Sequence, residues 1–297
     1  MAQQPMQGVF PILVTPFDAQ ERIDEDSLRS LVDFNIAAGV HGLGVAIGSE
    51  VFKFTEAERA QVTSCVVEQV RQRVPVVINT GAGGTALAVH YSRAAEDAGA
   101  DALMVIPPSF LPAGAAEILD YYKAISVAVH IPIFLQDVPA APISPGLARR
   151  IAEECENVRY IKVETLPVTA KVDDMVRAAG DVLTVFGGAG GSYFIEELRR
   201  GALGTMPFPS QPAAFVMVWD RYRQGDEAGA RTLFDGAIMA VNRLAVQGGD
   251  IFYHVHKQLL VRQGVIASAT VRGPTMPVDA VTQREIDAVI AHLHPVA

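Results

Sequence analysis

Lysine is scarce in this 297-residue sequence, and only one lysine lies in a segment typical of a strand. The five lysines are Lys53, Lys123, Lys162, Lys171 and Lys257. Lys162 lies in the apolar segment 158–165, whereas the other four lie in or beside helical patterns. Alternation along a strand places Tyr160, Lys162 and Glu164 on one face. Because burial disfavours a charged amine, an inward-facing Lys162 is predicted to be a neutral nucleophile that attacks a ketone.

A second interpretation of Lys162 is a structural ion pair with Glu164 near the mouth of the fold. Perturbed ionisable groups occur in structural networks as well as in active sites. The pattern alone leaves both interpretations open.

The histidines and glycines give weaker signals. His254 and His256 are two residues apart on a helical pattern and therefore point about 200° apart, which does not suit one metal ion. The Gly-rich segment 187–191 follows a strand-like run and opens a helix. Its N–H groups would hold a phosphate or carboxylate, or the segment is a tight turn that leaves room for a substrate. P-loop, nucleophile-elbow and zinc-ribbon motifs are absent from the sequence.

Eight apolar runs alternate with helical patterns along the first 225 residues. They are Val9–Thr15, Leu43–Ile47, Val76–Asn79, Ala102–Ile106, Ile133–Gln136, Tyr160–Glu164, Leu183–Phe186 and Leu203–Met206. Nearly continuous apolar runs are typical of parallel strands that are covered on both faces. Helix starts are indicated by a capping box at Thr55–Glu58 and by Ser144 before Pro145.

These units predict an α/β fold, a (β/α)₈ TIM barrel over residues 1–225, with the active site at the carboxyl ends of the strands. A doubly wound open sheet is the alternative, which the lack of a Gly-x-Gly-x-x-Gly turn disfavours. Residues 226–297 predict three helices, Ala228–Val246, Asp250–Gln263 and Val281–Leu293. No linker-like segment precedes them, so we expect a C-terminal helical extension of the same domain.

The composition limits the classes of binding partner and the cellular compartment that we expect for this protein. With 33 acidic and 24 basic residues, the net charge of −9 makes nucleic acids and anionic membranes poor partners. Cys65 and Cys155 lie in apolar patterns, which predicts reduced thiols and a cytoplasmic protein. We expect no signal peptide in residues 1–8 and no membrane-spanning segment, because no apolar run is long enough.

From Gly8 to about Pro274 the sequence is similar to the dihydrodipicolinate synthase / N-acetylneuraminate lyase family of class I aldolases and dehydratases. The matching motifs are Val14–Phe17, Gly48–Glu50, Thr55–Arg59, Val138–Pro139 and Tyr160–Glu164. The resemblance implies a (β/α)₈ barrel, a homotetramer, and no metal or organic cofactor. It also implies that Lys162 forms a Schiff base with a small-molecule 2-keto acid.

The sequence departs from the family at positions that bear on the substrate. Gln136 stands where family aldolases have the tyrosine of Tyr-Asn-x-Pro, and Ala46–Glu50 lacks the usual threonines. The arginine with which dihydrodipicolinate synthases bind their second substrate is missing from Ala140–Pro142. Their paired aromatic residues are replaced by Pro108–Phe110. These differences argue against dihydrodipicolinate synthesis.

One branch of the family shares several of these features. The Gln-Asp-x-Pro segment, Lys162 with Glu164, and Gly264–Ser268 resemble L-2-keto-3-deoxyarabonate dehydratases. The segment 187–191 does not resemble that branch. We therefore expect a Schiff-base lyase that eliminates water from a small 2-keto-3-deoxy sugar acid. Lys162 attacks C2, Glu164 moves a proton, and Gln136 positions the leaving hydroxyl or a water.

The expected substrate-binding residues are Gly48, Ser49, Thr15 and Gly187. The N–H groups of Gly48 and Ser49, with the Ser49 hydroxyl, are expected to hold the substrate carboxylate. Alternatives are a 2-keto-3-deoxy acid aldolase that releases pyruvate and, less favoured by the sequence, a dihydrodipicolinate synthase. A 2-keto acid-binding barrel without catalytic activity is the alternative of a different class.

Overall fold

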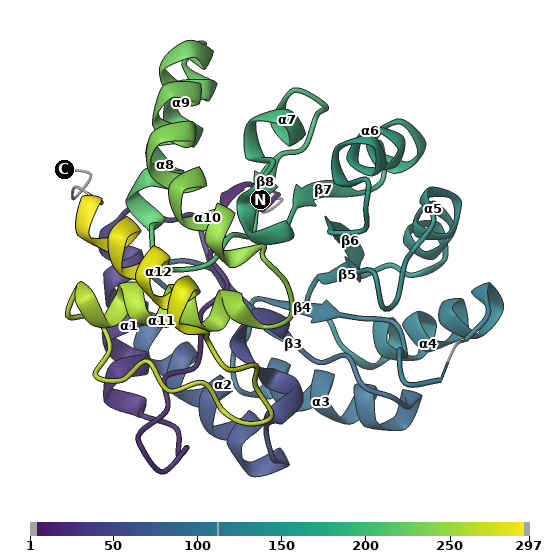
Figure 1. The fold of residues 1–297 in the computed structure, drawn as a ribbon. Helices are drawn as coiled ribbons and strands as arrows, with labels where there is room; N and C mark the ends of the chain where they lie inside the picture. Colours follow the sequence, from purple (N-terminus) through teal and green to yellow (C-terminus); the bar gives the residue numbers. More distant parts are fainter. Residues whose placement is uncertain (1–4, 112, 294–297) are drawn as a thin grey trace.

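The fold is a ring of eight parallel strands surrounded by helices (Figure 1). The computed structural model describes residues 5–111 and 113–293. The strands are β1 (Gly8–Val9), β2 (Leu43–Val45), β3 (Val76–Asn79), β4 (Ala102–Val105), β5 (Ile133–Asp137), β6 (Val158–Val163), β7 (Thr184–Gly187) and β8 (Gly204–Thr205). They pair in the order β1-β8-β7-β6-β5-β4-β3-β2, and a parallel bridge between Ile12 and Gly44 joins the two ends. The predicted (β/α)₈ barrel is confirmed.

The first strand is shorter than the sequence predicts. Regular pairing covers Gly8–Val9 rather than Val9–Thr15. Pro11 has no N–H to donate, and beyond it the chain pairs through separate bonds, from Ile12 N to Pro207 O and from Leu13 N to Gly44 O. The barrel is therefore closed here by an irregular segment.

Three other expected strands are also shorter. The strand expected at Ala102–Ile106 ends at Val105. The strand expected at Leu43–Ile47 ends at Val45, because Ile47–Ser49 forms the 3₁₀ helix η1. The strand expected at Leu203–Met206 is reduced to Gly204–Thr205.

Eight helices follow the strands. They are α1 (Glu25–Ala37), α2 (Glu56–Val70), α3 (Thr85–Asp97), α4 (Ala115–Ala128), α5 (Pro145–Glu154), α6 (Val168–Ala179), α7 (Phe194–Leu198) and α8 (Pro212–Arg223). Both predicted helix starts are confirmed. Thr55 and Glu58 form the capping box of α2, and Ser144 caps α5 before Pro145.

The barrel wall separates two apolar layers, and the alternation predicted for β6 is confirmed. Tyr160 packs inside the barrel, where it stacks on Phe134 with ring centroids 4.3 Å apart. Ile161 and Val163 pack in the outer layer against the helices. Lys162, two residues after Tyr160, therefore points inward near the carboxyl end of its strand.

The C-terminal extension consists of helices, as predicted. They are α9 (Glu227–Leu233), the π-helical turn η4 (Phe234–Ile238), α10 (Met239–Ala245), α11 (Ile251–Arg262) and α12 (Ala280–His292). The expected helix 228–246 is thus interrupted by a π turn. Figure 1 shows α10 and α11 in front of the strands. No helix within the described ranges has the length and apolar character needed to cross a membrane.

Arg272, which follows α11, connects the extension to the first turn of α2 through hydrogen bonds. Its guanidinium donates to the two carboxylate oxygens of Glu58 at 2.7 and 3.0 Å and lies 4.3 Å from the ring centroid of Phe17. The Arg272 hydrogen bond, helped by the N–H and hydroxyl of Thr55, lowers the pKa of Glu58 to about 2.

This contact predicts a pH dependence of stability. A carboxylate whose pKa falls from 4.5 to about 2 on folding adds stability that is present above pH 4.5 and lost as the pH falls toward 2. Glu58→Gln should lower the free energy of unfolding at pH 7 by roughly 1–3 kcal/mol and should weaken its dependence on pH between 2 and 4.5. Urea unfolding across this range measures both effects.

The matched control is Glu56→Gln, in the first turn of the same helix, where the exposed carboxylate pairs, among the described residues, with the exposed His90. The free energy of unfolding of Glu56→Gln should depend on pH in the same way as that of the wild type. Equal pH profiles for the two variants would show that Arg272 does not stabilise the fold through Glu58.

Candidate active site

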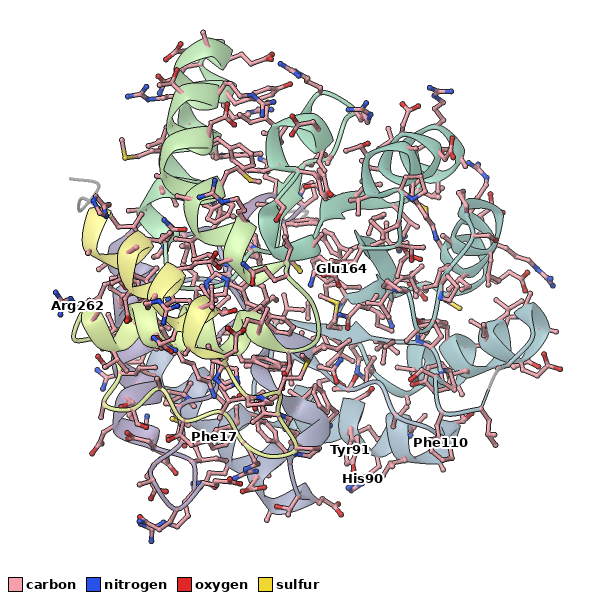
Figure 2. The ribbon with its side chains drawn as sticks, viewed as in Figure 1. Phe17, His90, Tyr91, Phe110, Glu164 and Arg262 are labelled. Carbon is pink, nitrogen blue, oxygen red and sulfur yellow. The ribbon has the colours of Figure 1, made fainter. Side chains whose placement is uncertain are left out.

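A cavity of about 780 Å³ opens at the carboxyl ends of the strands. Lys162 and Glu164 form one part of its wall, Asn79 at the end of β3 another, and Asn242 and Phe252 of the extension complete it. Figure 2 places Glu164 near the centre of the ring of strands, whereas Phe110 and Arg262 lie toward the periphery. The site is therefore where the barrel fold predicts it.

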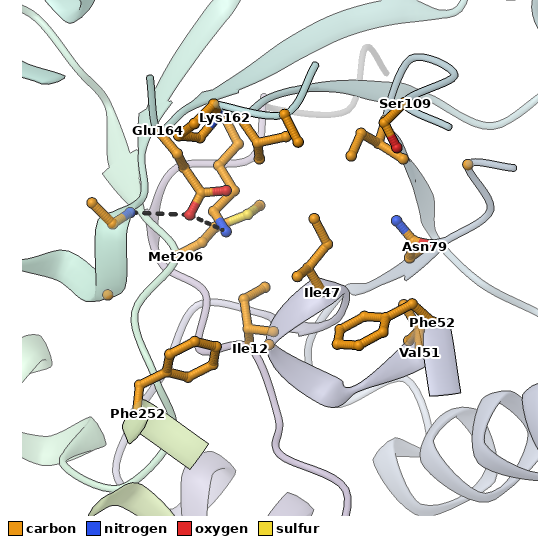
Figure 3. Close-up of a pocket in the computed structure, with 18 of the residues that line it drawn as sticks. Ile12, Ile47, Val51, Phe52, Asn79, Ser109, Lys162, Glu164, Met206 and Phe252 are labelled. Carbon is orange, nitrogen blue, oxygen red and sulfur yellow. Dashed lines mark hydrogen bonds and ion pairs between the residues drawn. The ribbon is translucent and has the colours of Figure 1, made fainter. Parts of the chain in front are cut away.

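Lys162 and Glu164 form an ion pair in the cavity wall. The Lys162 Nζ lies 3.0 Å from the Glu164 Oε1, with side-chain exposures of 7% and 17% (Figure 3). Of the five lysines, all of which the structure describes, Lys162 alone lines the cavity. The structural interpretation of the sequence predicted this pairing, whereas the catalytic interpretation predicted a neutral amine. Its position at a cavity, rather than in closed packing, makes the amine available to a ligand.

The Glu164 carboxylate is held by two further donors. The Ala189 N–H donates to Oε1 at 3.1 Å, and the Gln136 Nε2 donates to Oε2 at 3.3 Å. Gln136 is in register with Lys162 on the neighbouring strand and is completely buried. It lies behind Glu164 and does not line the cavity, so its observed contact is with the carboxylate. Its Oε1 has no partner among the described residues.

Asp137, next to Gln136, holds the ends of β5 and β6 together. The buried carboxylate accepts from the Ile143 N–H and from the Lys171 Nζ, each at 2.8 Å, and from the Thr165 N–H at 3.2 Å. Its carbonyl accepts from the Glu164 N–H at 2.9 Å. This network fixes the backbone that carries Glu164. The Gln-Asp-x-Pro motif contained Asp137, but spacing alone gave no reason to assign it this task.

Ser49 and Thr15 hold the turn beside Gly48. The Ser49 hydroxyl donates to the Leu13 carbonyl and accepts from the Ala46 N–H at 3.1 Å. The Thr15 hydroxyl donates to the Ser49 carbonyl at 2.7 Å. The Ser49 N–H donates to the Ala46 carbonyl at 2.8 Å. These groups are already hydrogen-bonded within the turn, and of the expected carboxylate-binding residues only Gly48 lines the cavity.

Glu50, the next residue, connects this turn to the extension. It has a left-handed conformation with φ of 61° and is completely buried. Its carboxylate pairs with the Lys53 Nζ at 3.0 Å and with the Lys257 Nζ of α11 at 2.5 Å. Burial lowers the pKa of Lys257 to about 8, although Glu50 opposes this. This cluster is not predictable from the sequence, because helical spacing does not show which lysine meets a distant carboxylate.

Gly187 lies on the outer side of the barrel wall rather than in the cavity. A Cβ on Gly187 would collide with the carboxyl group of Glu197, and a Cβ on Gly188 would collide with Glu164. The residues that line the cavity here are Ala189 and Gly190. Because the Ala189 N–H already donates to Glu164, the segment 187–191 forms a tight turn around that carboxylate.

The rest of the cavity is mainly apolar. Ile12, Ile47, Phe52 and Phe252 lie on the side that faces Lys162 and Glu164 (Figure 3). Asn79, also missed as a site residue, is 3% exposed, and its Nδ2 has no hydrogen-bond partner among the described residues. Figure 3 shows its amide directed into the cavity. The site therefore combines an amine, a carboxylate, the buried amides of Asn79 and Asn242 and the Arg59 guanidinium with mainly apolar walls.

Within residues 5–111 and 113–293, no group of three or more His, Cys, Asp or Glu side chains is arranged to hold a metal ion. The arrangement is suited to attack by an amine on a carbonyl carbon, with a carboxylate within reach to exchange protons.

Sequence comparison places this geometry among known proteins. The model of the Dihydrodipicolinate synthetase family matches residues 5–293. The L-2-keto-3-deoxyarabonate dehydratase of Azospirillum brasilense is 30% identical over 295 residues, which cover 97% of this chain and 94% of that protein. The 4-hydroxy-tetrahydrodipicolinate synthase of Sorangium cellulosum (strain So ce56) is 33% identical over 294 residues, 96% of this chain and 95% of that protein.

Solved structures with similar sequences have the same fold. The crystal structure of dihydrodipicolinate synthase from Rhodopseudomonas palustris superposes with a TM-score of 0.88 at 27% identity and covers 97% of each chain. A prophage protein of the dihydrodipicolinic acid synthase family from E. coli K12, solved in complex with pyruvate, gives a TM-score of 0.89 at 26% identity. That match covers 96% of this chain and 97% of the other.

Proposed function

This chain belongs to the dihydrodipicolinate synthetase family, and from that premise we propose that it is a Schiff-base lyase that removes water from a small 2-keto-3-deoxy sugar acid. The observation that carries the proposal is the Lys162 amine in the cavity wall, 3.0 Å from the Glu164 carboxylate. The pyruvate complex of the E. coli K12 relative supports a 2-keto acid as the ligand.

The Lys162–Glu164 pair supplies the first step of the mechanism. Proton transfer from the ammonium to Glu164 gives a neutral amine, which attacks C2 of the keto acid. Loss of the C2 oxygen as water leaves an iminium ion. This ion acidifies the C3 proton because it accepts the electron pair that remains.

Elimination follows from the same groups. Glu164, once it has returned its proton, removes the C3 proton, and the resulting enamine expels the C4 hydroxyl, which is protonated and leaves as water. Loss of a C5 proton and protonation at C3 then convert the unsaturated iminium ion into a C4–C5 enol, which tautomerises to the terminal aldehyde. Hydrolysis of the product imine restores Lys162, so the net change is the loss of one water molecule. Gly48, beside the turn held by Ser49 and Thr15, is the proposed contact for the substrate carboxylate. The Asn79 amide is the proposed contact for a substrate hydroxyl.

Gln136 favours elimination over aldol cleavage. Retro-aldol cleavage must deprotonate the C4 hydroxyl, and the family tyrosine that suits this task is replaced by a carboxamide with no acid–base chemistry near neutral pH. The similarity to the Azospirillum brasilense dehydratase supports the same choice. Several relatives are named 4-hydroxy-tetrahydrodipicolinate synthases, but this chain has no arginine in Ala140–Pro142 and no tyrosine at Gln136, which such a role implies. We also propose that the chain forms a homo-oligomer, a tetramer as is usual in the family.

The reaction type can be tested with a panel of 2-keto-3-deoxy pentonates and hexonates. We expect a dehydrated product, which is a semialdehyde from a pentonate and a 2,5-diketo acid from a hexonate, with at most traces of pyruvate. Turnover should lie in the ordinary enzyme range of about 1 s⁻¹ or more. The control is condensation of pyruvate with aspartate semialdehyde, which should be undetectable. Stoichiometric release of pyruvate from the best substrate would replace the dehydratase by the aldolase alternative. Binding without turnover of any member would favour the non-catalytic barrel.

Gln136 is expected to act through Glu164. Gln136→Ala removes the Nε2 donor from the Glu164 Oε2, so dehydration should slow by about 10²-fold, the usual effect of losing one positioned donor. Formation of the pyruvate Schiff base at Lys162 should slow less, because moving a proton from nitrogen to Glu164 is easier than removing one from C3. Gln136→Tyr should not increase dehydration. Steady-state rates, compared with the rate of reductive trapping, separate these effects, and equal losses in both would contradict a role mainly in removal of the C3 proton.

A further inference from the structure

Glu197 is a buried carboxyl group that the proposed reaction does not use. It lies on α7 and is completely buried. Neither carboxyl oxygen has a hydrogen-bond partner of good geometry among the described residues, although the Gly188 N–H lies close to the carboxyl group. A carboxylate that loses its hydration without gaining partners is strongly disfavoured, so a buried carboxyl group of this kind is expected to hold its proton.

Two glycines separate Glu197 from Glu164. A Cβ on Gly187 would occupy the space of the Glu197 carboxyl group, and a Cβ on Gly188 would occupy the space of the Glu164 side chain. The two acidic side chains therefore pack against two successive residues of one turn. The next residue of this turn is Ala189, whose N–H donates to the Glu164 Oε1 at 3.1 Å.

The charges around Glu197 favour its neutral form. Burial raises the pKa of Glu197 well above its usual range, and the negative charges of Glu164 and Glu196 raise it further. The Gly188 N–H and the Lys162 ammonium act in the opposite direction but are outweighed. Through Gly187 and Gly188, Glu197 lies one turn away from the ion pair of Glu164 and Lys162.

We propose that Glu197 is a neutral carboxylic acid during catalysis and a positioning residue for Glu164, acting through the turn Gly187–Ala189. The proposal rests on the proposed function. Glu197 supports the outer side of the turn, and the turn directs the Ala189 N–H to Glu164. Because Glu197 is neutral, the pair contains one ammonium and one carboxylate, and Glu164 remains the group that exchanges a proton with Lys162. A second carboxylate here would hold the proton on Lys162.

The protonation state can be measured without a substrate. At neutral pH, the infrared spectrum of the wild type minus that of Glu197→Gln should contain the carbonyl stretch of a protonated carboxylic acid. The band should be present in the wild type and lost in the variant. Glu196→Gln is the matched control, because this neighbouring carboxylate is partly exposed and pairs with Arg231; the band should persist there. A wild type without the band, or a band that remains in Glu197→Gln, overturns the proposal.

The positioning role can be measured by reductive trapping of pyruvate at Lys162 and by turnover. Glu197→Gln retains the shape and the neutral polar group, so its kcat should stay within roughly threefold of the wild type. Glu197→Leu removes the polar group, and kcat should fall about 10-fold or more while KM changes little, as expected for a loss confined to the transition state. Thermal unfolding of each variant identifies general loss of structure.

The outcomes separate the two proposals. Equal losses in Glu197→Gln and Glu197→Leu would mean that an ionised carboxylate is required, and an unchanged Glu197→Leu would exclude a positioning role. If the wild type is not trapped by pyruvate at all, the proposed function fails, whereas the infrared band still decides whether Glu197 is protonated.

Discussion

The site depends on one electrostatic requirement: an ammonium group that faces the barrel interior must have a carboxylate within reach. Lys162 is 5% exposed, and Glu164 supplies the negative charge at 3.0 Å. Burying either charge alone would be strongly unfavourable. Much of the surrounding structure therefore fixes the position of Glu164. Gln136 and the Ala189 N–H hold its carboxylate, and Asp137 holds its backbone.

A second buried ion pair, between Glu50 and Lys257, connects the barrel to the extension. Hydrogen bonds of Ser49 and Thr15 hold the turn that contains Gly48. The next residue, Glu50, anchors the turn through its ion pair with Lys257. Glu50 pairs with Lys257 of α11, so the helices after the barrel stabilise the turn beside the cavity. The extension thus contributes both to the cavity wall and to the support behind it.

The sequence was sufficient to predict the barrel and the place of Lys162, because both follow from local patterns. Apolar runs mark parallel strands, and the two-residue period of a strand places Tyr160 and Lys162 inside. Contacts between distant elements were not predictable in this way. Glu197 lies on a short helix and gave no periodic signal. Ser49 was expected to bind substrate, but its hydroxyl is used within the turn. The predicted length of strand β1 was too great, because an apolar run does not show how a proline interrupts strand pairing.

The central claim is that Lys162 forms a covalent imine with a 2-keto acid. Its most direct test is to incubate the protein with pyruvate and borohydride and to map the product by peptide mass spectrometry. The account predicts one reduced pyruvyl group per chain, on Lys162, and none in Lys162→Ala. Unmodified protein, or an adduct on Lys53, Lys171 or Lys257, would contradict it.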